Sequence, residues 1–216
     1  MFDRYDMEGQ ITKDGYTPIK LLTSHQDEVE CRYYYTEGAK KAVIWVGGIG
    51  GGWDTPARQL YPQLCQKLVN NERISSLRVR YRYPTDLDES ITDVIASIKF
   101  LEHAGIRSVG LVGHSFGGAV VIKAAIDVPN IVKTVITLST QSYAAVEAVS
   151  QLRQGCSILL IHGTNDDILW PSCSSYVYNQ ANNPKQIILY EGAKHGLEEA
   201  AEQVHQVVYQ WIVEHL

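Results

Sequence analysis

The chain has 216 residues, of which 45% are hydrophobic and 20% are charged, a composition typical of a globular domain in water. With 19 Lys and Arg against 24 Asp and Glu, the net charge is −5. This mild acidity argues against nucleic-acid binding, and no basic stripe runs along the sequence. No segment approaches the roughly 18 apolar residues of a membrane span. The length favours one domain over residues 1–216.

The N-terminus and the cysteines bear on the compartment. The first ten residues, MFDRYDMEGQ, are charged and lack the apolar stretch of a signal peptide. The four cysteines form no CxxC pair and have no metal-ligand spacing, and we expect them to be reduced and partly buried. We therefore expect a cytoplasmic protein without a metal site. The cysteines are Cys31, Cys65, Cys156 and Cys173.

Short runs rich in apolar and β-branched residues predict eight strands. Several of them, such as AVIWV and SILLI, are continuously apolar, which is typical of strands buried on both faces of a parallel sheet. The first two are expected to form an antiparallel edge. The predicted strands are Pro18–Leu22, Val29–Tyr35, Ala42–Val46, Leu77–Arg82, Ser108–Val112, Val132–Leu138, Ser157–Ile161 and Gln186–Tyr190.

Amphipathic segments between the strands predict helices. In residues 86–105, apolar residues recur at helical spacing, Asp86 and Glu89 can form a capping box, and Gly105 stands where the helix would stop. The segments 57–69 and 197–212 also have helical patterns. Alternating strands and helices predict an α/β fold: a doubly wound, mostly parallel sheet with helices on both faces. Chemistry in such sheets lies at the carboxyl ends of the strands.

The motif Gly-His-Ser-Phe-Gly at residues 113–117 follows the apolar strand SVGLV and precedes the helical run GGAVVIKAAI. This is G-x-S-x-G in its strand–turn–helix context, where a sharp turn projects the serine hydroxyl above the sheet and glycines relieve crowding. A plain glycine-rich turn is the alternative. The motif predicts that Ser115 is a nucleophile, that the backbone N–H of Phe116 faces an oxyanion, and that His114 packs inward.

From about Ala42 to the C-terminus the sequence resembles the α/β-hydrolase fold family, particularly its small esterase-like and dienelactone-hydrolase-like members. Dienelactone hydrolases proper carry cysteine at the nucleophile position, whereas this chain has Ser115. The resemblance therefore implies ester or thioester hydrolysis rather than lactone-specific chemistry.

The family's chain order of serine, acid and histidine indicates the other catalytic residues. The segment His162-Gly163-Thr164-Asn165-Asp166-Asp167 resembles the family's HGxxD segment, which implies Asp166 as the acid, with Asp167 as the rival and His162 ordering the acid loop. The segment GAKH after the last predicted strand resembles the family's G-x-x-H signature. It implies His195 as the general base, although a lone loop histidine is more often a surface residue.

A glycine-rich loop, Gly47-Gly48-Ile49-Gly50-Gly51-Gly52, follows the third predicted strand. It lacks the lysine and hydroxyl of a P-loop and the GxGxxG of a dinucleotide site. Its position matches the family's HG-x loop, which implies the N–H of Ile49 as the second oxyanion donor, with Gly50 as the alternative. Trp53 either walls an acyl pocket or packs structurally, and Asp54 is expected to cap the following helix.

These residues predict a serine hydrolase that transfers the acyl group of a small-molecule ester or thioester to water and needs no metal or organic cofactor. A peptidase or acyltransferase on the same triad is the first alternative, and a catalytically silent binding protein is the second. Residues 139–156 leave room for one crossover helix, expected at Tyr143–Leu152, so no large lid is predicted. An open site favours short or water-soluble acyl substrates.

Overall fold

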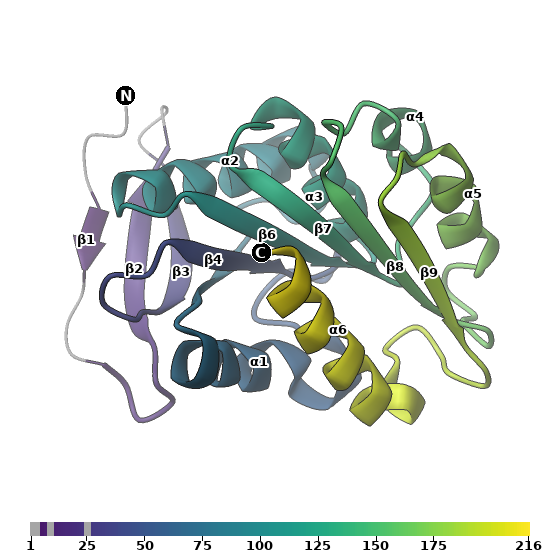
Figure 1. Ribbon diagram of the computed structural model, residues 1–216, viewed down its shortest axis with the longest axis horizontal. Helices are drawn as coiled ribbons and strands as arrows, with labels where there is room; N and C mark the ends of the chain where they lie inside the picture. Colours follow the sequence, from purple (N-terminus) through teal and green to yellow (C-terminus); the bar gives the residue numbers. More distant parts are fainter. Residues whose placement is uncertain (1–4, 8–10, 24–26) are drawn as a thin grey trace.

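Buried apolar runs form one sheet that lies between two layers of helices (Figure 1). The computed structural model describes residues 5–7, 11–23 and 27–216. The strands are β1 (Tyr5–Met7), β2 (Thr17–Leu22), β3 (Glu28–Tyr34), β4 (Lys41–Val46), β5 (Ser75–Arg80), β6 (Ser108–His114), β7 (Val132–Leu138), β8 (Ser157–Gly163) and β9 (Lys185–Tyr190). The helices are α1 (Pro56–Glu72), α2 (Leu87–His103), α3 (Phe116–Asp127), α4 (Ala145–Val149), α5 (Ser172–Gln180), the 3₁₀ helix η1 (Glu198–Ala200) and α6 (Ala201–His215).

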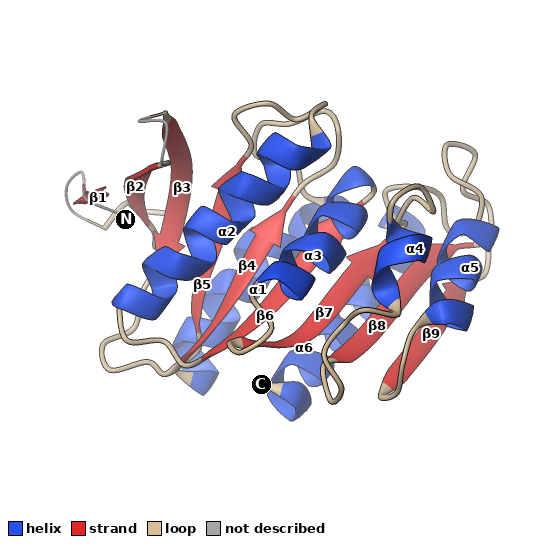
Figure 2. Cartoon of the chain, turned by 90° about the horizontal axis from the view of Figure 1, so that it is seen from above, coloured by secondary structure: helices blue, strands red, loops and turns tan. Residues whose placement is uncertain are grey.

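The strand order is β1-β2-β3-β5-β4-β6-β7-β8-β9. Strands β1, β2, β3 and β5 pair antiparallel, and the six strands from β5 to β9 in this order pair parallel. Helices α2, α3, α4 and α5 cover one face, and α1 and α6 cover the other (Figure 2). This is the α/β-hydrolase architecture, so the predicted fold class is confirmed.

The two helix layers explain why the central strands are apolar at every position. Along β4, Ala42, Ile44 and Val46 pack into the core under α2 and α3. The alternate residues Val43 and Trp45 pack into the core under α1 and α6. Because successive side chains point to opposite faces of a strand, burial of both faces requires an uninterrupted apolar run.

At the start of helix α2, the predicted capping box of Asp86 and Glu89 forms only in part. The carboxylate of Asp86 accepts a hydrogen bond from the Glu89 N–H at 3.1 Å, as a capping residue does. The reciprocal half of the expected capping box is absent, because the Glu89 carboxylate instead accepts a hydrogen bond from Arg82 at 2.6 Å. Gly105 lies just beyond the helix with φ +89°, which agrees with the predicted stop.

The connection between β7 and β8 leaves the carboxyl edge of the sheet open. The crossover helix was expected at Tyr143–Leu152, but α4 covers only Ala145–Val149. Ala144 has a left-handed conformation, with φ 60°, so the helix begins only at Ala145. After the helix, the Gln151 N–H donates to the Ala148 carbonyl, three residues back, in a turn. One short helix fills the connection, and no large lid covers this edge among the residues that the structure describes.

Candidate active site

The nucleophile candidate Ser115 lies between β6 and α3, at the carboxyl end of a central strand. Its backbone has φ 55° and ψ −120°, a strained conformation for a residue with a Cβ. The chain turns so sharply here that a Cβ on Gly113 would lie 2.1 Å from the Gly117 carbonyl oxygen. A Cβ on Gly117 would lie 2.4 Å from the carbonyl oxygen of Gly47. Glycine is therefore required on both sides of the serine, as the motif predicts.

Asp166 lies in the loop after β8, and its carboxylate is fixed from both sides. Its Oδ1 accepts hydrogen bonds from the backbone N–H groups of Ile168 and Leu169, each at 2.9 Å. Its Oδ2 lies 2.7 Å from Nδ1 of His195. The rival Asp167 is exposed and makes no hydrogen bond or ion pair to another described residue. Of the two aspartates, the structure brings Asp166 to the histidine.

The electrostatics of Asp166 favour the ionised form. Burial by itself raises the pKa of this carboxyl, but the hydrogen bonds from His195, Leu169 and Ile168 outweigh burial and hold the pKa below its ordinary value. An ionised carboxylate accepts the His195 Nδ1–H. This contact leaves Nε2 of the imidazole as the atom that can accept a proton.

The loop that carries His195 is tied to the rest of the active-site edge by its backbone. The carbonyl of His195 accepts a hydrogen bond from Nε2 of His114 at 3.0 Å. The next carbonyl, that of Gly196, accepts from the N–H of Ala57 at 2.7 Å. His114 itself is buried as expected, and burial lowers its pKa to about 4. At neutral pH it therefore acts as an uncharged donor.

The start of α1 forms a left-handed turn that the sequence did not indicate. Ala57, Arg58 and Gln59 have φ values of 49°, 50° and 68°. Such conformations persist only where contacts fix them. Glu198 accepts from the Arg58 N–H at 2.8 Å, and Nε2 of His205 donates to the Ala57 carbonyl at 2.7 Å. The turn thereby joins α1 to the histidine loop and to α6.

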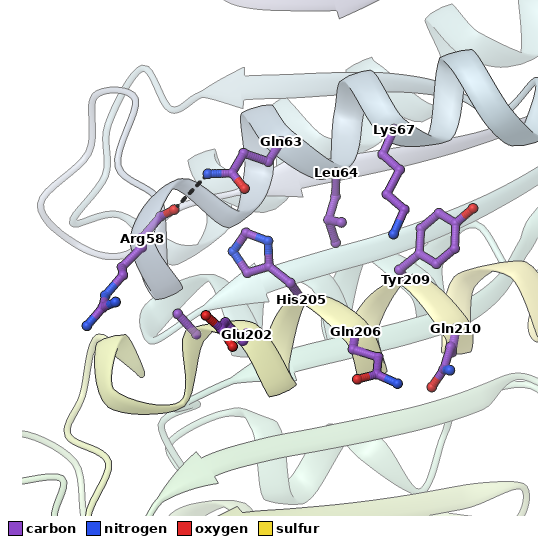
Figure 3. Close-up of a pocket in the computed structure, with 10 residues that line it drawn as sticks. Arg58, Gln63, Leu64, Lys67, Glu202, His205, Gln206, Tyr209 and Gln210 are labelled. Atoms are coloured by element: carbon purple, nitrogen blue, oxygen red, sulfur yellow. Dashed lines mark hydrogen bonds between the residues drawn. The ribbon is translucent and has the colours of Figure 1, made fainter.

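A groove of 690 Å³ runs between α1 and α6 beside this turn (Figure 3). Arg58, Lys67, Glu202, His205 and Tyr209 are among its lining residues. The Lys67 ammonium lies 3.9 Å from the centre of the Tyr209 ring, and Arg58 receives a hydrogen bond on its carbonyl. None of the predicted catalytic residues lines this groove, so it is separate from the active-site edge.

The glycine-rich loop after β4 lies against the nucleophile. A Cβ placed on Gly48 would be 3.3 Å from Cβ of Ser115 and 3.7 Å from its Oγ. Within the described part of the chain, the N–H groups of Ile49, Gly50 and Phe116 donate no hydrogen bond. An oxyanion site requires backbone donors that are not already bonded, and these three N–H groups meet that condition. The structure leaves Ile49 and Gly50 as equal candidates for the second donor.

The two residues after the glycines have structural partners. The Arg32 guanidinium lies 4.1 Å from the centre of the Trp53 ring, and Arg78 donates to the Trp53 carbonyl at 2.7 Å. These contacts favour packing over a role as acyl-pocket wall. The expectation that Asp54 caps α1 is wrong, because Thr55 is the N-cap residue and its Oγ1 accepts from the Tyr61 N–H at 2.9 Å.

The sequence did not predict one contact of the site and predicted another only in part. The contact of His114 with the His195 backbone joins residues 81 positions apart, and no local pattern marks it. The motif predicted that His162 orders the acid loop, and it does bond the Leu169 carbonyl at 2.9 Å, but its contact with the Asp166 carboxylate was not foreseen. Among described residues, no hydrogen bond joins the Ser115 hydroxyl to His195. Such catalytic hydrogen bonds often tighten only when substrate binds.

The described residues were also compared with what a metal site and a membrane-spanning helix require. The described residues bring no group of three His, Cys, Asp or Glu side chains together in a way that would hold a metal ion. In the same part of the chain, no helix combines the length and apolar composition needed to cross a membrane. All four cysteines are free, and three of them are buried.

Residues 49–157 match the model of the family described as alpha/beta hydrolase fold, and the chain belongs to this family. No curated protein sequence matches it. Among solved structures, a dienelactone hydrolase from Anabaena variabilis ATCC 29413 matches with 18% identity and a TM-score of 0.80, covering 93% of this chain and 98% of that one. The esterase domain of a Rhodothermus marinus protein has 17% identity and a TM-score of 0.74, covering 93% and 99%. A Paleococcus ferrophilus monoacylglycerol lipase has 17% identity and a TM-score of 0.72, covering 88% and 100%.

Proposed function

We propose that this chain is a serine hydrolase that cleaves carboxylic esters or thioesters through an acyl-enzyme intermediate. The observation that carries the proposal is the 2.7 Å contact between His195 Nδ1 and Asp166 Oδ2, on loops at the same sheet edge as the strained Ser115. An acid–base pair beside a serine in an elbow is the arrangement that activates a hydroxyl nucleophile. Esterase and lipase names among the structural matches support ester substrates.

In the proposed reaction, the Ser115 oxygen forms a bond to the substrate carbonyl carbon while Nε2 of His195 takes the hydroxyl proton. The carbonyl π electrons move to the oxygen, which becomes an oxyanion facing the N–H groups of Phe116 and of Ile49 or Gly50. Each such donor contributes about 2.7–4 kcal/mol to transition-state stabilisation. Asp166 holds the tautomer of the imidazole and stabilises its protonated form.

The tetrahedral intermediate then breaks the bond to the leaving group, and His195 gives that alcohol or thiol its proton. A water molecule repeats the sequence on the acyl-enzyme: His195 takes a water proton, the new oxygen bonds to the acyl carbon, and the acid leaves as Ser115 regains its proton. None of these steps calls for a metal or an organic cofactor.

The open sheet edge bears on which substrates the site accepts. The β7–β8 connection holds only the five-residue α4, so no inserted lid encloses an acyl chain within the described part of the molecule. Burial of a long acyl chain therefore contributes little to binding, because affinity for apolar groups scales with the area removed from water. We propose a preference for small, water-soluble acyl substrates.

A panel of short-chain esters, thioesters and peptides tests the proposal, with Ser115→Ala as the control. The proposal expects turnover of esters or thioesters that is lost in Ser115→Ala. Turnover of peptides alone would make the protein a peptidase on the same triad, and transfer to an added alcohol in preference to water would make it an acyltransferase. A folded protein that hydrolyses none of the three classes would contradict enzymatic function and favour a binding protein.

A further inference from the structure

A second histidine, His162, contacts the same carboxylate oxygen of Asp166 as His195 does. His162, in β8, is fully buried, and its Nε2 is 3.0 Å from Oδ2 of Asp166. The same nitrogen lies 2.9 Å from the Leu169 carbonyl oxygen. Its other ring nitrogen, Nδ1, lies 2.7 Å from the hydroxyl of Ser174, which is also fully buried. Both ring nitrogens of His162 therefore have a partner, although the side chain is buried.

The partners determine where the ring proton lies. A carbonyl oxygen and an ionised carboxylate only accept, so Nε2 of His162 must carry the hydrogen and share it between Leu169 and Asp166. Nδ1 is then the acceptor, and the Ser174 hydroxyl donates to it. Burial lowers the pKa of His162, which favours the neutral ring. Its contribution is a directed hydrogen bond rather than a charge.

Four N–H groups thus lie at the Asp166 carboxylate, two at each oxygen. Backbone N–H groups of Ile168 and Leu169 bond Oδ1, and N–H groups of His162 and His195 lie at Oδ2. A carboxylate offers about four lone-pair sites, so this set uses all of them. Rotation of the carboxylate away from His195 would break contacts on both oxygens.

We propose that His162 is a positioning residue that holds the Asp166 carboxylate toward His195, and that the Ser174 hydroxyl holds the His162 ring in the orientation in which it can do so. The inference rests on the proposed function for its effect on rate. Without the Ser174 hydroxyl, Nδ1 of His162 would be a buried acceptor that has lost its donor, and the ring would lose the contact that holds its outer edge. The contact from Nε2 to Asp166 would then be held less firmly.

Two matched pairs of variants test the proposal. His162→Gln keeps an N–H donor near the position of Nε2, whereas His162→Met has a similar length and no donor. Ser174→Ala removes the hydroxyl on Nδ1. Its control is Ser175→Ala, one residue further along α5, whose hydroxyl donates to the Pro171 carbonyl at 3.4 Å and to no other described residue. Thermal unfolding, the rate of fluorophosphonate labelling and the downfield proton resonance of the His195 Nδ1–H are measured for each.

We expect His162→Met to slow labelling by about tenfold to a hundredfold and to shift or broaden the His195 resonance, with His162→Gln recovering most of both. We expect Ser174→Ala to act in the same direction and Ser175→Ala to match the unmodified protein. If His162→Met does not fold, the comparison of Ser174→Ala with Ser175→Ala tests the proposal instead. Equal behaviour of Gln and Met, or of the two serine variants, would overturn the proposal. An unreactive parent protein whose His195 resonance still responds to these substitutions would contradict the proposed function but not the positioning role.

Discussion

Burial of His114 makes the folded state sensitive to acid. The residue is 6% exposed and donates from Nε2 to the His195 carbonyl at 3.0 Å, and burial lowers its pKa from 6.5 to about 4. In the unfolded chain the ring takes up a proton near pH 6.5, whereas in the folded protein it does so only near pH 4. The unfolded state binds more protons between these values, so the free energy of unfolding falls as the pH falls through this window.

The size of the effect follows from the same two values. Each pH unit in which only the unfolded chain holds the proton lowers the free energy of unfolding by about 1.4 kcal/mol. His114 alone therefore accounts for a loss of about 3 kcal/mol across the window. That is a large share of the 5–15 kcal/mol, roughly, by which small proteins are stable.

Urea unfolding of the unmodified protein and of His114→Gln, at several pH values from 7 to 4, measures this loss. Glutamine keeps an amide donor but does not titrate, so between pH 6.5 and 4 the free energy of unfolding of the unmodified protein should fall by about 3 kcal/mol more than that of His114→Gln. His162, whose pKa burial also lowers, contributes the same slope to both curves and cancels in the difference. The lowered pKa of Asp166 acts at lower pH, below the ordinary carboxyl value of 3.8. Parallel curves for the two proteins would refute the assignment of this acid sensitivity to His114.

Three further predictions concern the site and its access. Asp166→Asn should lower kcat on p-nitrophenyl acetate by about 10⁴-fold, whereas Asp167→Asn should change it by less than about threefold; the reverse order would show that the acid is misassigned. Gly117→Ala places a Cβ 2.4 Å from the Gly47 carbonyl oxygen and should lower both the melting temperature and the rate of serine labelling; an unchanged rate would contradict the tight elbow. Rates on a graded series of p-nitrophenyl esters should fall with chain length and show no jump above the micellar concentration, and micellar activation with a long-chain optimum would contradict the lidless site.

The sequence predicts the central sheet well because burial on both faces leaves a strong local signal. Val132–Leu138 has the predicted bounds, and the other predicted strands differ from the structure by at most two residues at either end. Strand β1 was missed because its three residues, Tyr5–Met7, are too short to show an alternating pattern. Its antiparallel pairing with β2 depends on a partner more than ten residues away.

At the candidate active site, the sequence predicts which residues lie at the sheet edge but not how they are held. Ser115, Asp166 and His195 follow from motifs that lie next to strand ends. The left-handed turn at Ala57 and the hydrogen bond from His114 to the His195 carbonyl connect segments that are distant in sequence, so they became visible only in three dimensions. Ser174 is similar, because a single serine in a helix gives no sign that its hydroxyl reaches a buried histidine.

The most direct test of the account is the reaction of the protein with a fluorophosphonate, followed by mass spectrometry of the intact chain and its peptides. If Ser115 is activated by His195 and Asp166, a single adduct forms on Ser115, and Ser115→Ala forms none while it unfolds at the same temperature. An adduct that forms equally fast in Ser115→Ala, or a folded parent protein that forms none, would contradict the account.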